Sequence, residues 1–458
     1  MLRALERQKV LTISTVHLFI IAGTVATLLS FILESKIVFF LLGIINLCIF
    51  IKYIYHSPVY IVSITLLAAH PFSYTLAKTG IPLISPCVII LLNLFALIIL
   101  IRREKGLYLP EYLSKYLGGL FVFLLLVFAK LVQGGFSAIG MDIFIYFLGF
   151  GFIASVLTLF TMSRTYDIQR MIMFTLRYYA IYAIAVVGFI MLKAGNLEEI
   201  SKLENTIGIS YFATLGLAMS IFSKMDDRWY RFFLTCISLF IVITCGQRSF
   251  LIGYFILIIM WGLFKSPSKK ILILRFIVSI LVFLACLFAI SKSENSKIRQ
   301  MQQFASAPTE YIDDVKSAKN IIESYSATGT IGNRIFLWFT AIETANPIYG
   351  NGLGDFASVI NEEGMSYPHN ILIETYELFG YGGLILLLVY LFSSAKRSLI
   401  IIQHNNYYSI FAFANIVLLF VLQFSSSIFG LFCGYIAFDI CNYIALSRNQ
   451  RNLAFQAT

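Results

Sequence analysis

Long apolar segments separated by short polar gaps make up most of this chain. Fourteen of them approach or exceed the roughly 20 mostly apolar residues that a helix needs to cross a bilayer. Several are separated by only a few residues, so twelve or thirteen spans fit the same pattern. The pattern predicts an all-α, polytopic membrane helical bundle of about 12–14 transmembrane helices. The segments are residues 10–33, 37–54, 57–77, 81–101, 117–134, 139–162, 172–192, 206–223, 230–246, 249–264, 271–291, 371–392, 406–424 and 427–446.

One long polar segment, residues 292–370, interrupts this pattern and carries six Lys or Arg against nine Asp or Glu. Apolar residues recur in it at helical spacing over 311–322 and again over 335–342. Asn333 fits the N-cap of the second helix, which we expect to end just before Pro347. Both helices are amphipathic, so we expect them to lie on the bundle or in the lipid headgroup region.

The segment divides the chain into three predicted parts. Residues 1–291 form an N-terminal bundle of about eleven spans, residues 292–370 a loop, and residues 371–458 about three C-terminal spans. No internal repeat or soluble domain is evident in the sequence.

The distribution of positive charge orients the bundle. Gaps on one side of the predicted membrane are basic, whereas the opposite gaps are short or acidic, with Glu198, Glu199 and Glu204 in one of them. Positive charge gathers on the cytoplasmic side of membrane proteins. We therefore expect a multi-pass protein of the bacterial inner membrane with cytoplasmic N- and C-termini and a periplasmic 292–370 loop. The basic residues are Lys52, Arg102, Arg103, Lys105, Lys115, Arg164, Arg170, Lys224, Arg228, Arg231, Lys265, Lys269, Lys270, Lys396, Arg397, Arg448 and Arg451.

Composition agrees with this topology. The chain is 59% hydrophobic and 12% charged, whereas soluble domains carry about 25% charged residues. The net charge of +11 follows from the cytoplasmic bias, so nucleic acid is not an expected partner. None of the seven cysteines lies in the 292–370 loop and no CxxC pair occurs, so we predict neither disulfides nor a metal site.

Three residues on the periplasmic side are candidates for catalysis. His369 precedes a span, and Pro368 favours a helix start that would put His369 and Asn370 in its first turn. A histidine can take a proton from a hydroxyl near neutral pH, or make only a structural hydrogen bond. Arg248 follows a long apolar run, where it can bind phosphate or extend to lipid headgroups. Arg334 lies at the start of the 335–342 helix, where it can bind phosphate or be solvated.

Other polar residues cluster near the same face. The run from Gly350 to Gly354 either binds an anion through free backbone amides or forms a tight turn. Glu377 lies two turns after His369, where it can orient that residue or pair with a loop cation. Lys130, near the outer end of its span, can pair with lipid phosphate or an acidic residue.

These residues resemble the conserved region of the O-antigen ligase and polymerase family. The likeness covers about residues 334–383, and Gln247-Arg248-Ser249 resembles the family's Ser-Arg element at a span end. One departure is Ala345, the eleventh residue after Arg334, where some polymerases have glycine. The matching run is Arg334-x3-Trp338, Pro347-x2-Gly350-x-Gly352-x-Gly354, His369-Asn370-x-Leu372 and Glu377-x2-Gly380-x2-Gly383.

The resemblance implies a glycosyltransferase that uses a glycan on undecaprenyl diphosphate as donor, without metal or other cofactor. Arg248 and Arg334 would stabilise the departing diphosphate, and His369 would deprotonate or position the acceptor hydroxyl. In a polymerase the acceptor is another lipid-linked repeat unit, and in a ligase it is the lipid A-core. Flippase and chain-length regulator proteins are further implied partners. The implied substrate-binding residues are Glu377, Asn370, Lys130, Gly352, Gly354 and Trp338.

Three other classes of protein fit the sequence less well. A metal-dependent membrane glycosyltransferase commonly has acidic residues in its first external loop, which here is only about 34–36. A lipid-linked glycan transporter favours repeats and broken mid-membrane helices, and a scaffold does not need Arg248, Arg334 and His369 on one side. We therefore predict a surface-polysaccharide polymerase, with O-antigen ligase as the alternative.

Overall fold

The computed structural model describes residues 36–58, 60–63, 79–81, 84–104, 111–164, 228–244, 331–360, 368–404, 409–425 and 431–457, and a few single positions between 183 and 277. Within these ranges the chain forms helices and turns and no strand. Four helices there are long and apolar enough to cross a membrane, namely Pro86–Arg103, Leu113–Gln133, Ala138–Ser163 and Ile371–Gln403. The all-α membrane fold predicted from the sequence is confirmed.

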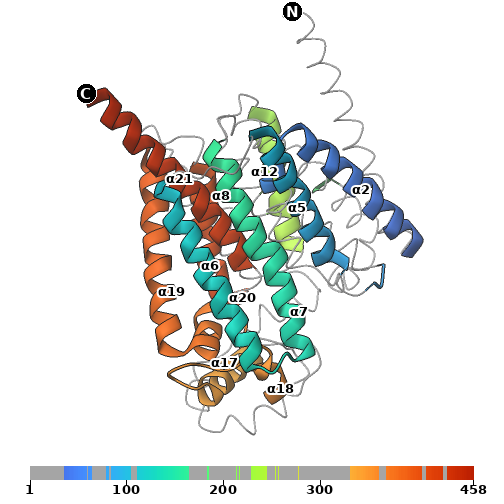
Figure 1. Cartoon of the computed structure of the whole chain (residues 1–458), viewed down its shortest axis with the longest axis vertical. Helices are drawn as coiled ribbons and strands as arrows, with labels where there is room; N and C mark the ends of the chain where they lie inside the picture. Colours follow the sequence, from blue (N-terminus) through green and yellow to red (C-terminus); the bar gives the residue numbers. More distant parts are fainter. Residues whose placement is uncertain are drawn as a thin grey trace, which may run out of the picture. The chain divides into compact units, whose positions relative to one another are not determined.

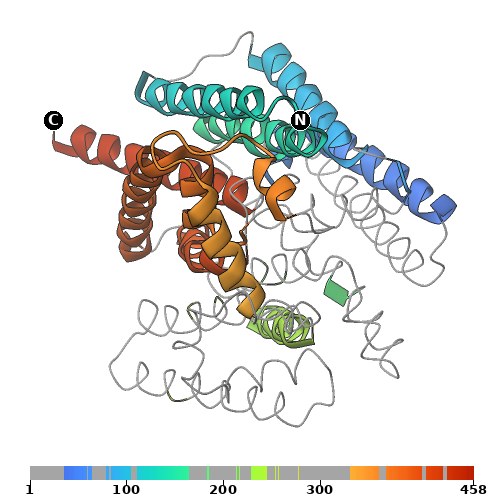
Figure 2. The same cartoon turned by 90° about the horizontal axis from the view of Figure 1, so that it is seen from below.

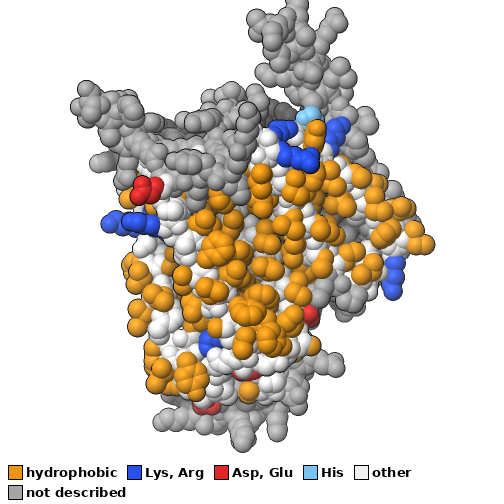
Figure 3. Space-filling view, in the orientation of Figure 1, with side chains coloured by type: hydrophobic (Ala, Val, Ile, Leu, Met, Phe, Trp, Pro, Cys, Tyr) orange, Lys and Arg blue, Asp and Glu red, His pale blue; other side chains and the backbone are white. Residues whose placement is uncertain are grey.

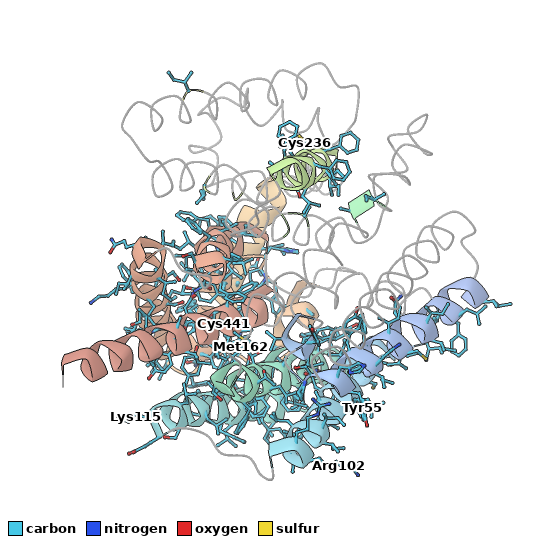
Figure 4. The ribbon with its side chains drawn as sticks, turned by 90° about the horizontal axis from the view of Figure 1, so that it is seen from above. Tyr55, Arg102, Lys115, Met162, Cys236 and Cys441 are labelled. Carbon is cyan, nitrogen blue, oxygen red and sulfur yellow. The ribbon has the colours of Figure 1, made fainter. Side chains whose placement is uncertain are left out.

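The chain divides into two compact units, of which the first comprises residues 1–108 and 160–245. Its described helices are α2 (Lys36–His56), α3 (Tyr60–Ser63), α5 (Ile84–Glu104) and α12 (Arg228–Thr244). Arg103 of α5 donates hydrogen bonds to the backbone carbonyls of Tyr55 and His56, which are free at the end of α2. This arginine joins the ends of α2 and α5, where Figure 4 labels Tyr55 and Arg102.

The second unit comprises residues 109–159 and 246–458 and holds most of the candidate residues. A single helical rod in it runs through α7, the π-helix η2 and the start of α8. Figures 1 and 2 show this rod beside α6, with α17, α18 and the start of α19 gathered at one end of the unit. Its helices are α6 (Glu111–Gln133), α7 (Ala138–Tyr146), η2 (Phe147–Ile153), α8 (Ala154–Arg164, which ends in the first unit), α17 (Ile331–Thr344), α18 (Asp355–Ile360), α19 (Ile371–His404), α20 (Ser409–Ser425) and α21 (Leu431–Ala457).

The core of this unit lies between α19, α20 and α21, which pack against one another. Phe411, Phe413 and Phe438 are fully buried there, and Cys441, labelled in Figure 4, is buried beside them. On the outside, hydrophobic side chains cover the visible face of α6 and α7 (Figure 3). Apolar residues on both the inside and the outside are typical of helices whose outer surface contacts lipid.

A buried ion pair ties α19 to α21 at the end of the unit far from α17. Asp439 is completely buried and accepts two hydrogen bonds from the Arg397 guanidinium, at 3.0 and 2.6 Å. Ser394 and Tyr116 donate to the same carboxylate at 2.7 and 2.8 Å. The charge of Asp439 is therefore fully compensated inside the bundle, which a buried carboxylate requires.

Helix α19 is longer than the predicted span. It continues to His404, twelve residues past the predicted end at 392, so Lys396 and Arg397 lie in the helix. Arg397 pairs with Asp439 there, whereas Lys396 is exposed.

The other predicted spans fare as follows. Those at 37–54, 81–101, 117–134, 139–162, 230–246, 406–424 and 427–446 each coincide with described helix. The spans at 10–33, 172–192, 206–223, 249–264 and 271–291 fall mostly or wholly outside the described residues, and 57–77 is described only in part. The three-part division of the chain stays a prediction.

Candidate functional site

Helix α19 is broken at Gly380, where φ is 64° and ψ is −162°. The segment that connects α17 to α18, residues 345–354, packs against this break, and we call it the glycine loop. The Tyr381 amide donates to the Pro347 carbonyl at 2.9 Å, and the Asn351 amide donates to the Glu377 carbonyl at 2.7 Å. The glycine loop therefore supplies the hydrogen bonds that the broken helix lacks.

Glycines are required where the loop meets its neighbours. A Cβ on Gly380 would lie 2.6 Å from the Pro347 carbonyl oxygen, and a Cβ on Gly350 would lie 2.5 Å from the Phe379 amide nitrogen. A Cβ on Gly352 would lie 2.5 Å from the Cα of Gly134, in the turn after α6. Backbone therefore packs directly on backbone, which only glycine allows.

The amides from Gly350 to Leu353 in the glycine loop are already bonded inside the protein. Asp355 places its carboxylate where an external anion would bind, because the Gly352 amide donates to its Oδ2 at 2.7 Å. The structure therefore supports the tight turn rather than the anion site suggested by the glycine run. The other bonds of this run go to backbone carbonyls: the Gly350 amide donates to Asn346, the Asn351 amide to Glu377 and the Leu353 amide to Lys130. The Asp355 amide donates to the Gly352 carbonyl.

Lys130, at the end of α6, holds the glycine loop from the other side. Its side chain is 8% exposed and donates to Gln133 Oε1 at 2.7 Å and to the Tyr349 carbonyl. Its ammonium lies 5.8 Å from the centre of the Phe379 ring. Gln133 adds a hydrogen bond to the Gly350 carbonyl at 3.0 Å. Lys130, which the sequence suggested would pair with lipid phosphate or an acidic residue, thus donates a hydrogen bond to the backbone of the glycine loop.

Two buried carboxylates lie on α19 beside this lysine. Glu374 and Glu377 are 3% and 2% exposed, and they interact electrostatically with each other. Glu377 also interacts with Lys130 and receives a hydrogen bond from the Asn351 side chain. Its Oε1 atom has no hydrogen-bond partner among the described residues. The cation with which Glu377 interacts is Lys130 of α6, so its expected pairing with a loop cation or with His369 stays a prediction.

His369 precedes α19 and does not lie in its first turn, which corrects the sequence prediction. The helix begins at Ile371, and Asn370 caps it by accepting hydrogen bonds from the amides of Leu372 and Ile373, at 2.9 and 3.3 Å. His369 adopts a φ of 58°, in the left-handed region that non-glycine residues rarely occupy. Such a conformation is found mostly where the surroundings impose it, often at functional sites.

Two hydrogen bonds fix the segment that carries His369. The Trp338 indole of α17 donates to the Pro368 carbonyl at 2.9 Å. The Asn370 side-chain amide donates to the Gln423 carbonyl in α20 at 3.0 Å. Trp338 and Asn370, expected to contact substrate, thus hold the backbone on either side of His369.

Helix α17 differs in two ways from its predicted form. It begins at Ile331, so Asn333 lies inside it and is not its N-cap, and Arg334 is in its first turn. Its end at Thr344 agrees with the predicted stop before Pro347. The buried face is formed by Leu337 and Ala341, which pack with Phe356 and Ile373, whereas Phe339 and Ile342 are 46% exposed each. The predicted apolar face is therefore partly wrong.

The remaining predictions fall outside the described residues. They are Arg248 and the helix expected over 311–322. The sequence interpretation missed Gln133, Gly134 and Asp355, which pack or bond directly with the glycine loop. No local signal marks Gln133 or Gly134, since their partners are more than 200 residues away along the chain.

Comparison with known protein families gives a match. The search of curated proteins found none. Residues 232–388 match the family described as O-antigen ligase, a range that includes Arg248, Arg334, the glycine loop, His369 and the break at Gly380. This confirms the family predicted from the sequence motifs. Residues 232–388 are therefore similar to the O-antigen polymerase and ligase family, whose members are glycosyl-transferring enzymes.

Proposed function

We propose that this protein is a polymerase that joins undecaprenyl-diphosphate-linked repeat units into an O-antigen or similar surface polysaccharide at the periplasmic face of the inner membrane. The observation that carries the proposal is the family match over residues 232–388, which includes all three candidate catalytic residues. The fixed backbone around His369 supports it, because a catalytic group needs a defined position.

The proposed reaction is metal-independent glycosyl transfer. An acceptor hydroxyl attacks the anomeric carbon of the donor, the bond from that carbon to the diphosphate oxygen breaks, and undecaprenyl diphosphate leaves. His369 accepts the hydroxyl proton or positions the hydroxyl. Arg248 and Arg334 stabilise the negative charge that develops on the diphosphate. No cofactor takes part in this scheme.

The other residues named from the sequence divide into two groups in this proposal. Glu377 is kept as a proposed substrate-binding residue because it belongs to the matching motif, and its carboxylate is 2% exposed. The other five residues position the backbone of the glycine loop and of the segment that carries His369. They are Lys130, Gly352, Gly354, Trp338 and Asn370.

O-antigen ligase is the second candidate, because the matching family carries that description. The donor and the bond broken are the same, and the acceptor is then the lipid A-core. The sequence favours polymerase only through its composition. It is rich in Phe, Tyr, Ile, Asn and Lys, the residues that AT-rich genes encode, and polysaccharide gene clusters are often AT-rich. Flippase and chain-length regulator proteins are proposed partners in either case.

The deciding experiment is the surface polysaccharide profile of a deletion strain beside its complemented strain. A profile with single repeat units on the core and no ladder identifies a polymerase. Bare core with polymer accumulating on its lipid carrier identifies a ligase. An unchanged profile rejects both and restores the transporter as the leading alternative.

Complementation with single variants tests the site assignment. Arg248→Ala and Arg334→Ala should each abolish or sharply reduce transfer while the protein remains in the membrane. Lys115→Met provides a control, because Lys115 is exposed at the far end of α6. Full activity of both arginine variants would contradict the assignment.

A further inference from the structure

The tip of the glycine loop carries two large apolar side chains that are exposed on the part of the chain that the structure describes. Ile348 is 81% exposed and Tyr349 is 60% exposed. Their backbone is nevertheless fixed, because the Asn346 side chain accepts hydrogen bonds from both amides, at 3.0 and 3.2 Å. Lys130 holds the Tyr349 carbonyl. The two side chains therefore project outward from a rigid turn.

This tip continues the apolar outer face of α19. The Tyr381 amide donates to the Pro347 carbonyl at 2.9 Å, so the turn lies against the broken helix. Exposed side chains then follow along one side of α19, at Tyr381 (59%), Ile385 (59%), Val389 (61%) and Phe392 (79%). Their spacing of three or four residues places them on one helical face. In a membrane-spanning helix such a face contacts lipid.

The length of α19 indicates where the bilayer ends. After the break at Gly380, residues 381–404 extend about 36 Å at 1.5 Å per residue, whereas the hydrocarbon core is about 30 Å thick. Exposed Lys396 marks the polar boundary near one end of this segment. The stretch from the break to Lys396, residues 381–395, is about 22 Å long. The break at Gly380 therefore lies at the boundary between acyl chains and headgroups on the loop side.

Tyrosines gather at this level. Tyr376 and Tyr381 pack with their ring centres 5.0 Å apart, and Tyr349 lies on the turn bonded to the same break. Tyrosine and tryptophan are enriched at membrane interfaces, where the ring meets acyl chains and the hydroxyl meets water.

We propose that the Ile348–Tyr349 turn inserts into the headgroup–acyl boundary of the lipid bilayer and anchors the glycine loop there. The occupant of this surface is phospholipid, because the turn continues the lipid-facing side of α19. If the proposed function holds, the anchor keeps the glycine loop at the height of the donor's diphosphate. The lipid contact itself does not depend on that function.

Photocrosslinking tests the proposal directly. The full-length protein is purified with p-benzoylphenylalanine at position 348 or 349 and irradiated in nanodiscs of phosphatidylethanolamine and phosphatidylglycerol without glycan substrate. Phe392 replaced in the same way gives a lipid-facing control, and Glu343, exposed and charged four residues before Pro347, gives a water-facing control. Mass spectrometry then detects phospholipid adducts on the protein.

We expect phospholipid adducts at 348 and 349 at a yield similar to 392 and at least about fivefold above 343. Adducts at 392 with none at 348 and 349 would overturn the proposal, and so would a crosslinked dimer formed through 348 or 349. Because no glycan is present, adducts at 348 and 349 support the anchor even if the deletion strain shows no polysaccharide defect. The two proposals are thus tested separately. The deletion strain can contradict the proposed function while crosslinking supports the lipid anchor, and crosslinking can contradict the anchor while the deletion strain supports the function.

Discussion

The carbonyl of Glu377 and the amide of Tyr381 lie four residues apart in α19 and do not bond to each other. In an uninterrupted helix these two groups form a hydrogen bond. Here the Glu377 carbonyl accepts from the Asn351 amide at 2.7 Å, and the Tyr381 amide donates to the Pro347 carbonyl at 2.9 Å. One helical hydrogen bond is thus replaced by two to the glycine loop, so the loop and the helix must fold together.

Gly380→Ala should disrupt this junction. The backbone angles at Gly380 suit only glycine, and an added Cβ would lie 2.6 Å from the Pro347 carbonyl oxygen. We expect a loss of about 1–3 kcal/mol in unfolding free energy and a strong loss of transfer. Thermal unfolding of the purified protein in detergent measures the first effect.

Gly382→Ala is the matched control, two residues further along the same helix. A Cβ there meets nothing within 4 Å. Alanine favours helix over glycine by about 1 kcal/mol, so this variant should be as stable as the wild type or more so. Equal stability of the Gly380 and Gly382 variants would contradict the role assigned to the break.

Lys130→Met should weaken the attachment of the glycine loop to α6. The change removes the hydrogen bond to the Tyr349 carbonyl and the positive charge near Glu377. Leaving these buried acceptors without the lysine should cost about 1–3 kcal/mol. Lys115→Met, on the exposed opposite end of α6, should have no measurable effect on stability.

A double-mutant cycle isolates the interaction between Lys130 and Glu377. If the two charges interact as the structure indicates, Lys130→Met together with Glu377→Gln should lose less stability than the sum of the single changes. A coupling energy of about 0.5–3 kcal/mol is expected for such neighbours. Strict additivity would show that Lys130 acts only through the loop backbone.

His369→Asn separates the imidazole from the backbone conformation that carries it. Asparagine tolerates the left-handed region better than most residues, so a φ of 58° should persist. If His369 is the base, transfer should fall by about 100-fold or more with little change in thermal stability. His369→Ala adds backbone strain and should also be less stable. Near-normal transfer by the asparagine variant would leave His369 with a structural role alone.

Arg397→Met should affect stability and not transfer. It leaves Asp439 as an unpaired charge in the core, which typically costs about 3–5 kcal/mol. Arg397 lies 17 residues past the break at Gly380, about 25 Å along the helix, and His369 lies on the other side of the break, so transfer per folded molecule should be unchanged. Lys396→Met, at the exposed neighbouring position, should leave stability unchanged too. Normal thermal stability of the arginine variant would contradict the buried ion pair.

Local sequence determined where the long apolar helices lie in the part of the chain that the structure describes. Apolar length alone decides this, and α5, α6 and α20 begin and end within a few residues of their predicted bounds except at the start of α6. The motif between Arg334 and Gly383 determined the family in the same way, because the order and spacing of its residues are visible along the chain. The charge of the gaps gave a topology that remains a prediction.

Tertiary structure alone decided how those parts meet. The attachment of α19 to α21 depends on the pair of Arg397 with Asp439, 42 residues later, and the position of the glycine loop depends on Lys130, 219 residues before Tyr349. The glycine run and the break at Gly380 look like two separate features in the sequence. They form one structure because each supplies the backbone hydrogen bonds that the other lacks, and pairing between distant backbone groups leaves no pattern in the local sequence.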